Sequence, residues 1–257
     1  MWQEDRHQRI RALLATFGRV SAERIATELA VSRETVRRDL LDLELAGDLK
    51  RVRGGAVAAG GEPEPPIAVR AKVRVREKRA IARTAAARIS AGQTLFLDAG
   101  STTTLLAEAL SGHSGLTVIT NSVDIAMKLG GDEGRARGNQ AMLLGGEILD
   151  GLAATCGAAT VAEIHRYRAD FALLSPVGFD ARYGATSFDP REAEIARAMA
   201  ENARAVAILA DHAKIGAPSR ISYCPADGVD LLVTDGGATE TPSLSAIRAK
   251  VGEVLIA

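Results

Sequence analysis

Residues 20–56, which read VSAERIATELAVSRETVRRDLLDLELAGDLKRVRGGA, decide how this 257-residue chain is interpreted. Ser21 and Ser32 are suited to cap two successive helices, and Gly47 is suited to end the second in the left-handed conformation. Apolar residues recur on one face of each predicted helix, at Ile25, Ala26 and Leu29 in the first and at Val36, Leu40 and Leu43 in the second. Two short helices joined by a tight turn are typical of a helix-turn-helix.

A basic hairpin is predicted after the second helix. Residues 49–52 and 56–57 have the pattern of two short strands, with Arg53, Gly54 and Gly55 at the tip. The whole pattern indicates a winged helix-turn-helix, which places its second helix in the DNA major groove, while a basic tip suits a phosphate strand or the minor groove. The residues expected to face double-stranded DNA are Ser32, Arg33, Thr35, Arg37, Arg38, Arg51 and Arg53.

The distribution of charge agrees with this interpretation, although an arginine-rich helix alone is more often a solvated surface. Residues 1–79 contain 17 Lys and Arg against 12 Asp and Glu, whereas residues 80–257 contain 15 against 20. Such an asymmetry is typical of a nucleic-acid module joined to a small-molecule module. Three of the eight prolines and Gly60 and Gly61 fall in residues 56–69, which favours a linker. We therefore expect a DNA-binding domain at 1–57, a linker at 58–76 and a second domain at 77–257.

The second domain has the pattern of an α/β fold with a largely parallel sheet. After a helix at 77–90, short apolar runs alternate with amphipathic segments. The expected strands are 94–98, 117–120, 141–144, 171–175, 205–209 and 231–234, and the expected helices are 103–110, 123–129, 161–165, 191–202 and 243–250. Residues 130–140 are expected to be a solvated connection. In such sheets, ligands bind beyond the carboxyl ends of the strands.

Small and polar residues follow most of these strands. After the first, Asp98 precedes a Gly-Ser-Thr-Thr-Thr run that opens a helix, and such a helix start can cradle a phosphate. Neither a Walker A loop nor a dinucleotide fingerprint is present, so no cofactor is predicted. Each polar strand end alone is explained by ordinary capping, but their recurrence favours a lined ligand pocket.

Both halves resemble the DeoR family of bacterial transcriptional regulators. In the first, the family's recognition-helix pattern matches Val31, Ser32, Thr35, Arg37, Arg38, Asp39 and Leu40, while Arg53 stands where the family usually has histidine. In the second, LDAGSTTTLLAEAL, LTVITNS, MLLGGEI and AILADHAKIG resemble motifs of its effector domain, which is similar in fold to ribose-5-phosphate isomerase and the coenzyme A transferases. The resemblance implies a phosphorylated sugar as effector. It implies effector contacts at Asp98, Gly100, Ser101, Thr102, Thr103, Asn121, Gly145, Gly146, Glu192, Asp211 and Lys214.

We therefore expect a cytoplasmic repressor, forming a homo-oligomer (a dimer or a tetramer), that a phosphorylated sugar releases from its operator. Two alternatives stay open. One is a sugar-phosphate isomerase-like enzyme that carries a DNA-binding domain and uses Glu192 or Asp98 as its base, and the other is a DNA-binding structural protein with a degenerate pocket. No metal site is expected because the four histidines lack ligand spacing, and no membrane span is expected because no apolar run is long enough. Cys156 and Cys224 are expected to be small buried residues.

Overall fold

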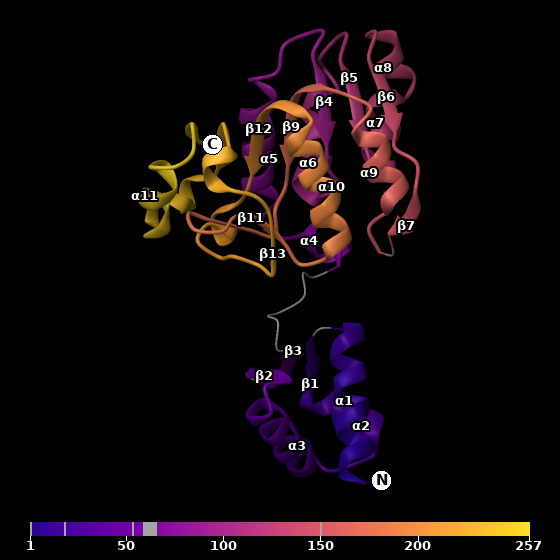
Figure 1. The fold of residues 1–257 in the computed structure, drawn as a ribbon, viewed down its shortest axis with the longest axis vertical. Coiled ribbons are helices and arrows are strands. Elements are labelled where there is room, and N and C mark those ends of the chain that lie inside the picture. The colour runs from indigo at the N-terminus through magenta and orange to yellow at the C-terminus, as the bar shows by residue number, and fades with distance from the viewer. Residues whose placement is uncertain (1, 18, 53, 59–65, 150) are drawn as a thin grey trace. The chain divides into compact units, whose positions relative to one another are not determined.

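The computed structural model describes residues 2–17, 19–52, 54–58, 66–149 and 151–257. Contacts divide the chain into two units, Met1–Glu64 and Pro65–Ala257 (Figure 1). By this division, residues 65–76 of the predicted linker belong to the second unit, and they include the short helix α4 (Ile67–Arg70).

The first unit is a winged helix-turn-helix, which confirms the predicted architecture. Its elements are α1 (Gln3–Phe17), β1 (Arg19–Ser21), α2 (Ala22–Leu29), α3 (Arg33–Leu45), β2 (Leu49–Val52) and β3 (Gly55–Ala58). The strands form an antiparallel sheet in the order β1-β3-β2, so the predicted hairpin gains a third strand. Ser21 and Ser32 cap α2 and α3 as expected. Gly47 has a φ of 80°, and the Asp48 N–H bonds to the Leu43 carbonyl, which is a Schellman ending.

A buried carboxylate fixes α3 against α1. The Asp39 side chain is 2% exposed, and it accepts hydrogen bonds from Arg6 Nε at 2.7 Å and Arg6 Nη2 at 2.8 Å. His7 Nε2 lies 3.4 Å from the same carboxylate. Ile10 from α1 and Val36 from α3 are fully buried in the core beside it. The ion pair of Arg6 and Asp39 therefore sets which face of α3 turns inward and which face remains exposed.

A seven-stranded parallel sheet forms the centre of the second unit, which confirms the predicted α/β fold. In spatial order its strands are β6 (Gln140–Leu143), β5 (Thr117–Thr120), β4 (Thr94–Leu97), β9 (Ala169–Leu174), β12 (Ala203–Leu209), β14 (Leu231–Thr234) and β15 (Glu253–Ile256). From β4 the chain builds outward through β5 and β6, then returns to place β9 on the other side of β4. The order of strands thus reverses between β4 and β9, where α/β proteins bind ligands.

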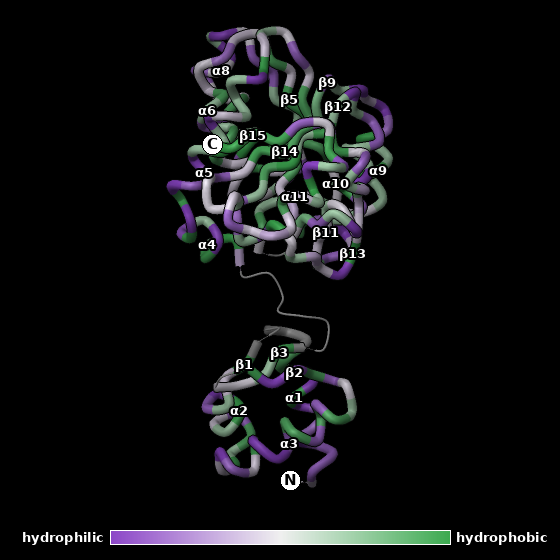
Figure 2. Tube along the Cα trace, turned by 90° about the vertical axis from the view of Figure 1, so that its left-hand side faces the viewer, coloured by the Kyte–Doolittle hydropathy of each residue, from purple (hydrophilic) through white to green (hydrophobic). Residues whose placement is uncertain are grey.

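Helices cover both faces of this sheet. One face packs on α5 (Val75–Ala86), α6 (Ser101–Leu110) and α7 (Val123–Gly130), and the other on α9 (Ala158–Ile164), α10 (Pro190–Glu201) and α11 (Ser243–Arg248). Along β4, Leu95 and Leu97 pack with α5, α6 and α7, and Phe96 packs in the core on the side of α9, α10 and α11. The side chains alternate because successive residues of a strand point to opposite faces. Figure 2 shows the sheet strands among the most hydrophobic stretches of the tube.

Several elements differ from the sequence-based expectations. Residues 130–140 are not a simple loop, since they contain α8 (Asp132–Ala136), and the predicted helix 77–90 is α5, which begins at Val75. Two small antiparallel sheets were not anticipated: β7 (Glu147–Leu149) with β8 (Ala154–Cys156), and β10 (Gly178–Asp180) with β11 (Gly184–Ser187) and β13 (Ile221–Cys224). Both cysteines are buried, as expected. No helix among the described residues is long and apolar enough to cross a bilayer.

Replacing Asp39 by Asn should destabilise the first unit. The change leaves Arg6 without its carboxylate, and we expect a loss of about 1.5–3 kcal/mol, the usual contribution of a hydrogen bond to a charged group. Hydrogen exchange of the α3 amides in the full chain measures this loss.

The matched control is Asp42→Asn on the same helix, where the carboxylate accepts a 2.8 Å bond from Gln3 at the exposed surface. It should change stability by less than about 0.5 kcal/mol. Equal losses in the two variants would contradict the anchoring role of Asp39.

Candidate DNA-binding helix and effector site

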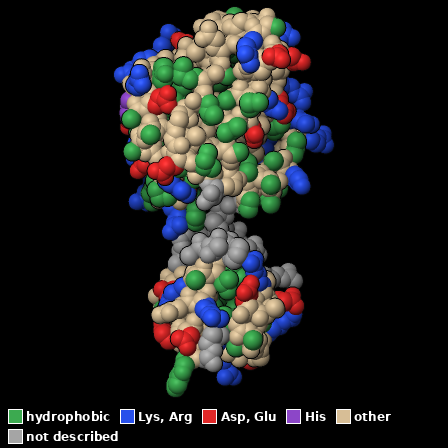
Figure 3. All heavy atoms as spheres, turned by 90° about the vertical axis from the view of Figure 1, so that its right-hand side faces the viewer, with side chains coloured by type: hydrophobic (Ala, Val, Ile, Leu, Met, Phe, Trp, Pro, Cys, Tyr) green, Lys and Arg blue, Asp and Glu red, His purple; other side chains and the backbone are tan. Residues whose placement is uncertain are grey.

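The outer face of α3 presents the arginines that the sequence predicts for DNA. The Arg37 and Arg38 side chains are 75% and 79% exposed, and each lies near Glu34, at 3.6 Å and 3.9 Å. Arg33 is 69% exposed and pairs with Glu23 of α2. Pairs this exposed contribute roughly 0–1 kcal/mol, so a phosphate or a base edge can replace them. On the face shown in Figure 3, acidic and basic side chains are interspersed over each unit.

The other predicted DNA contacts have local roles. Ser32 Oγ accepts the Thr35 N–H at 3.1 Å and lies 2.9 Å from Thr35 Oγ1, so both hydroxyls take part in the cap of α3. Arg51 bonds to Glu44 through its backbone N–H at 2.8 Å and through Nε at 2.6 Å. The backbone hydrogen bond from Arg51 is the main cause that holds the pKa of Glu44 below its ordinary value. Arg53 lies outside the described residues.

In the second unit, Asp98 occupies the point where the strand order reverses. It follows β4, and its Oδ2 accepts the N–H of Ser175, which follows β9, at 2.9 Å. Burial raises the pKa of Asp98 to about 7, and the nearby Glu192 adds to the rise. A buried acid that titrates near neutrality is a frequent mark of a functional site.

The N-terminus of α6 lies beside Asp98. The hydroxyl of Thr103 donates to the backbone carbonyls of Asp98 at 2.8 Å and Gly100 at 3.1 Å, which closes the loop between strand and helix. A Cβ at Gly100 would come within 3.2 Å of the Ser175 side chain, so glycine allows the two strand ends to approach. The first N–H groups of α6 have no carbonyl acceptors within the helix, as at any helix start, and can hold an anion.

Several buried oxygens at this edge lack a hydrogen-bond partner within the described residues. They are Asp98 Oδ1, Thr102 Oγ1, Asn121 Oδ1 and Asp211 Oδ2, which follow β4, β5 and β12. Thr102 and Asp211 are 0% exposed. A buried polar atom without a partner costs about 1–3 kcal/mol, so four of them at one edge of the sheet indicate positions that a polar ligand fills.

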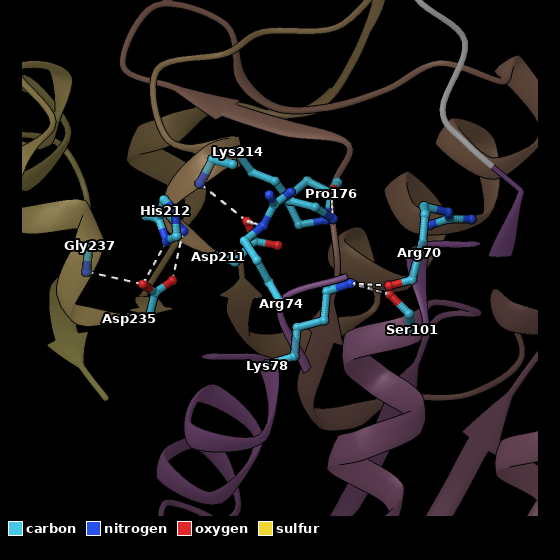
Figure 4. A network of polar contacts seen from close by, with 11 residues as sticks. Arg70, Arg74, Lys78, Ser101, Pro176, Asp211, His212, Lys214, Asp235 and Gly237 are labelled. Atoms are coloured by element: carbon cyan, nitrogen blue, oxygen red, sulfur yellow. Dashed lines mark hydrogen bonds and ion pairs between the residues drawn. The ribbon is translucent and has the colours of Figure 1, made fainter. Parts of the chain in front are cut away.

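Three cations surround Asp211 (Figure 4). Arg74 Nε lies 2.7 Å from Asp211 Oδ1, and Lys214 Nζ donates to the Pro176 carbonyl. Lys78 is 3% exposed and donates to Ser101 Oγ at 3.0 Å. Burial lowers the pKa of Lys78 to about 8, and the nearby positive charge of Lys214 contributes to the lowering.

His212, which follows Asp211 in the chain, has a specific partner. Its Nδ1 lies 2.8 Å from Asp235 Oδ2, and its side chain is 37% exposed. The His212 N–H also donates to Asp235 at 2.7 Å, and the Gly237 N–H donates at 3.0 Å. Burial acts to raise the pKa of Asp235, but these hydrogen bonds hold it below the ordinary value.

The remaining predicted effector residues have different surroundings. Gly145 N–H donates to Glu163 of α9 at 2.8 Å. A Cβ at Gly146 would meet Thr160 Oγ1 at 2.0 Å, so close packing against α9 accounts for this second glycine. Asn121 Nδ2 donates to the Thr155 carbonyl of β8 at 2.9 Å. Glu192 accepts a 3.2 Å bond from Ser187.

Sequence reasoning missed Arg74, Lys78 and Ser175. Lys78 carried a usable signal, because it lies three and seven residues before Ile81 and Ala85, on the buried face of α5. A lysine on an apolar stripe indicates a specific partner. Arg74 and Ser175 carried no local signal, since their partners are distant in sequence.

Comparison with known proteins agrees with this geometry. Residues 6–60 match the model of the DeoR-like helix-turn-helix domain, and residues 73–236 match that of the DeoR C terminal sensor domain. The chain belongs to the DeoR family. The glycerol-3-phosphate regulon repressor of Escherichia coli K12 is 34% identical over 91% of this chain and 92% of its own length. The transcriptional repressor GlcR of Bacillus subtilis is 35% identical over 91% and 89%.

A solved structure of another protein overlaps with part of this DeoR-family chain. Ribose 5-phosphate isomerase from Plasmodium falciparum covers 53% of this chain and 51% of its own, at 16% identity and a TM-score of 0.38. This partial overlap says nothing about chemistry.

Asp98→Asn should stabilise the second unit near pH 8. The folded-state pKa of about 7 lies above the ordinary value, so folding favours the neutral acid. The resulting stability is fully present below about pH 4 and is lost as the pH rises through about 7. Asn keeps an oxygen for the Ser175 N–H without burying a charge, and the gain at pH 8 is at most a few kcal/mol.

Thermal unfolding of wild type and variant between about pH 5 and pH 8 measures this difference, which should shrink toward the acidic end. Asp132→Asn, at a fully exposed carboxylate, is the control. A difference that stays constant with pH would show that Asp98 is not held with a raised pKa.

Proposed function

We propose that this DeoR-family protein is a transcriptional repressor of a sugar or polyol catabolic operon, and that a phosphorylated sugar or polyol relieves repression. The winged helix-turn-helix with Arg37 and Arg38 on its exposed face supports operator binding. The names of its relatives, a glycerol-3-phosphate regulon repressor and the repressor GlcR, support the biological role. A repressor acts where the DNA lies, so we place it in the cytoplasm.

The observation that carries the effector class is that oxygens without partners among the described residues lie at the same edge of the sheet as three cations, Arg74, Lys78 and Lys214. Carboxylate oxygens of Asp98 and Asp211 are suited to accept hydrogen bonds from sugar hydroxyls. Lys78, Arg74 and Lys214 supply positive charge beside the start of α6, where a phosphate is stabilised. Uncharged sugars would satisfy the carboxylates but would add no negative charge beside these cations.

Assembly follows from the size of the DNA interface. One winged helix buries too little DNA surface for strong specificity, so we propose a homo-oligomer, a dimer or a tetramer, that binds repeated half-sites. Light scattering that returned a monomer both with and without operator DNA would contradict this.

An enzymatic alternative has one observation in its favour. Asp98 is buried, titrates near neutrality and lies close enough to Glu192 for their charges to interact, which are properties of an acid–base pair. Turnover of a pentose or hexose phosphate, followed by NMR with purified protein, would favour an isomerase over a sensor.

Substitution of Arg37 or Arg38 by Ala should weaken operator binding. If the arginine binds a base edge, its removal should cost about 1–3 kcal/mol and relax one base preference. If it binds a phosphate, its removal should weaken binding to all sequences and lower the salt slope by about one. Titration of an operator selected from a random DNA library, at several salt concentrations, distinguishes the two.

Arg135→Ala is the control for this test, because it removes an arginine that is 72% exposed in the second unit. If all three variants bind the operator as the wild type does, the assignment of α3 as the recognition helix is wrong.

A phosphorylated ligand should bind far better than its free counterpart. Calorimetry with glycerol 3-phosphate against glycerol, and glucose 6-phosphate against glucose, should show about a 10–100-fold difference for the pair that contains the effector, the usual effect of one charge-assisted hydrogen bond. Lys214→Ala should reduce this ratio, whereas Lys128→Ala, at an exposed ion pair with Glu108, should not. Equal affinities within every pair would remove the phosphate from the proposed effector.

A further inference from the structure

The seven-stranded sheet of the second unit ends at β6 (Figure 1). Within the described residues, β6 pairs with β5 on its inner side and with no other strand on its outer side. The N–H groups of Gln140 and Leu144 donate to backbone carbonyls on the β5 side, at 2.7 Å and 2.8 Å. The backbone groups of successive residues in a strand alternate in direction, so those of Ala141 and Leu143 point outward. They offer donors and acceptors to a further strand.

Exposed apolar side chains accompany this open edge. Met142 and Leu143 of β6 are 37% and 42% exposed. Met127 of α7, which packs against β6, is 73% exposed, and Ile148 of β7 is 69% exposed. These four residues are termed the edge patch. Figure 3 views the second unit from the side of β6 and shows hydrophobic side chains at the surface among the charged ones.

The opposite edge of the same sheet, β15, is protected by charge. Natural sheets prevent unwanted pairing by placing charged residues or proline on their edge strands. On β15, Glu253 forms an ion pair with Arg88 of the same unit at 2.5 Å. β6 reads Gln-Ala-Met-Leu and contains neither a charged residue nor a proline. An apolar edge strand of this kind is expected to be covered by a partner in the working assembly.

A second copy of the same chain complements this edge in charge. Arg137 precedes β6, Glu147 follows it, and both residues are exposed. They are equally far in sequence from Met142, so antiparallel pairing about a two-fold axis at Met142 brings Arg137 of each copy toward Glu147 of the other. The same register places Ala141 opposite Leu143 of the second copy, and these are the residues whose backbone groups point outward. An unrelated strand would meet the backbone groups equally well, but a second copy carries the matching charges too.

We propose that β6 is a dimer interface, at which two copies of this chain pair their edge strands antiparallel about a two-fold axis through Met142. This inference rests on the homo-oligomer of the proposed function, because it assigns a surface to that assembly. The pairing joins the two seven-stranded sheets into one and buries the edge patch of each copy against the other. Asp98 and Asp211 follow β4 and β12, which lie within the sheet rather than at this edge. Substitutions on β6 therefore test assembly separately from effector binding.

The proposed register makes a specific demand at Met142. Its backbone groups face β5, so the two Met142 residues form a pair without hydrogen bonds across the axis. The Cα atoms of such a pair are about 4.5 Å apart. This distance falls within the range of about 4.4–6.8 Å that a disulfide spans. Leu143 lies opposite Ala141 of the second copy instead, so a cysteine at position 143 does not face its own counterpart.

Disulfide cross-linking of the full chain tests this register. Met142→Cys, oxidised with diamide at micromolar concentration, should convert most chains into a covalent dimer on a non-reducing gel. Leu143→Cys should give at least about tenfold less dimer. Ile256→Cys is the matched control, since Ile256 on β15 has the same 37% exposure as Met142, and it should give no dimer above the wild type. The native Cys156 and Cys224 are both buried, so the wild type should give little.

Sedimentation equilibrium measures the same interface without a cross-link. Met142→Lys places two like charges together on the axis, so association should weaken at least about a hundredfold and the mass of the oligomer should fall to half. Ile256→Lys adds the same charge to β15 and should leave the mass unchanged. Arg137→Glu and Glu147→Arg should each weaken association about threefold to tenfold, and the double variant, which exchanges the two charges, should restore it.

No cross-link through Met142→Cys, or a stronger one through Leu143→Cys, would overturn the inference. Circular dichroism accompanies the mass measurements, and the cross-link decides if Met142→Lys proves to be unfolded. An oligomeric wild type whose mass is unchanged in a folded Met142→Lys variant would refute the interface and leave the proposed homo-oligomer standing. A wild type that is monomeric with and without operator DNA would refute both. Release of the operator by a sugar phosphate, measured on the wild type, tests the proposed effector role independently of either result.

Discussion

The second unit depends on a hydrogen bond at the reversal of its strand order, where Asp98 accepts the Ser175 N–H at 2.9 Å. The bond joins the ends of β4 and β9, whose shared register includes Leu97 and Leu173, both at most 1% exposed. A carboxylate is an unfavourable group to bury, and the raised pKa of Asp98 reflects that. It remains in place because the strands beneath it are held by fully buried side chains. Polar groups that a ligand needs are thus held by the core of the fold.

The first unit uses a buried carboxylate in a different way. Asp39 is satisfied by Arg6 and fixes α3, whereas Arg37 and Arg38 on the opposite face make long, exposed ion pairs with Glu34. Removing one partner of a buried ion pair is strongly destabilising, so such a pair defines the orientation of the helix. Exposed pairs, in contrast, are weak enough to exchange for DNA. Asp39 therefore fixes the orientation of α3, and different residues of the same helix, Arg37 and Arg38, are available to bind DNA.

The sequence predicted those features that depend on local pattern. Residues 117–120 and 231–234 coincide with β5 and β14, and the caps at Ser21 and Ser32 follow from side chains three residues from their partners. The packing role of Gly146 was not foreseen, because a glycine after a strand has the same pattern whether it faces a phosphate or Thr160 of a neighbouring helix. The contact between Asp98 and Ser175 spans 77 residues, a separation that no local pattern encodes.

At the edge of the sheet where β4, β5 and β12 end, several buried polar atoms have no partner among the described residues. These atoms determine what a ligand can do there. Asp211 Oδ2 and Thr102 Oγ1 raise the free energy of the ligand-free protein, and the left-handed Arg74 adds to it. A ligand shifts an equilibrium only through contacts that differ between the two states, however tightly it binds. Contacts to Thr102, which is held by the core, are available in either state and supply affinity. A contact that replaces a bond of the ligand-free protein, such as the pair of Arg74 with Asp211, is the kind of contact that can differ between two states.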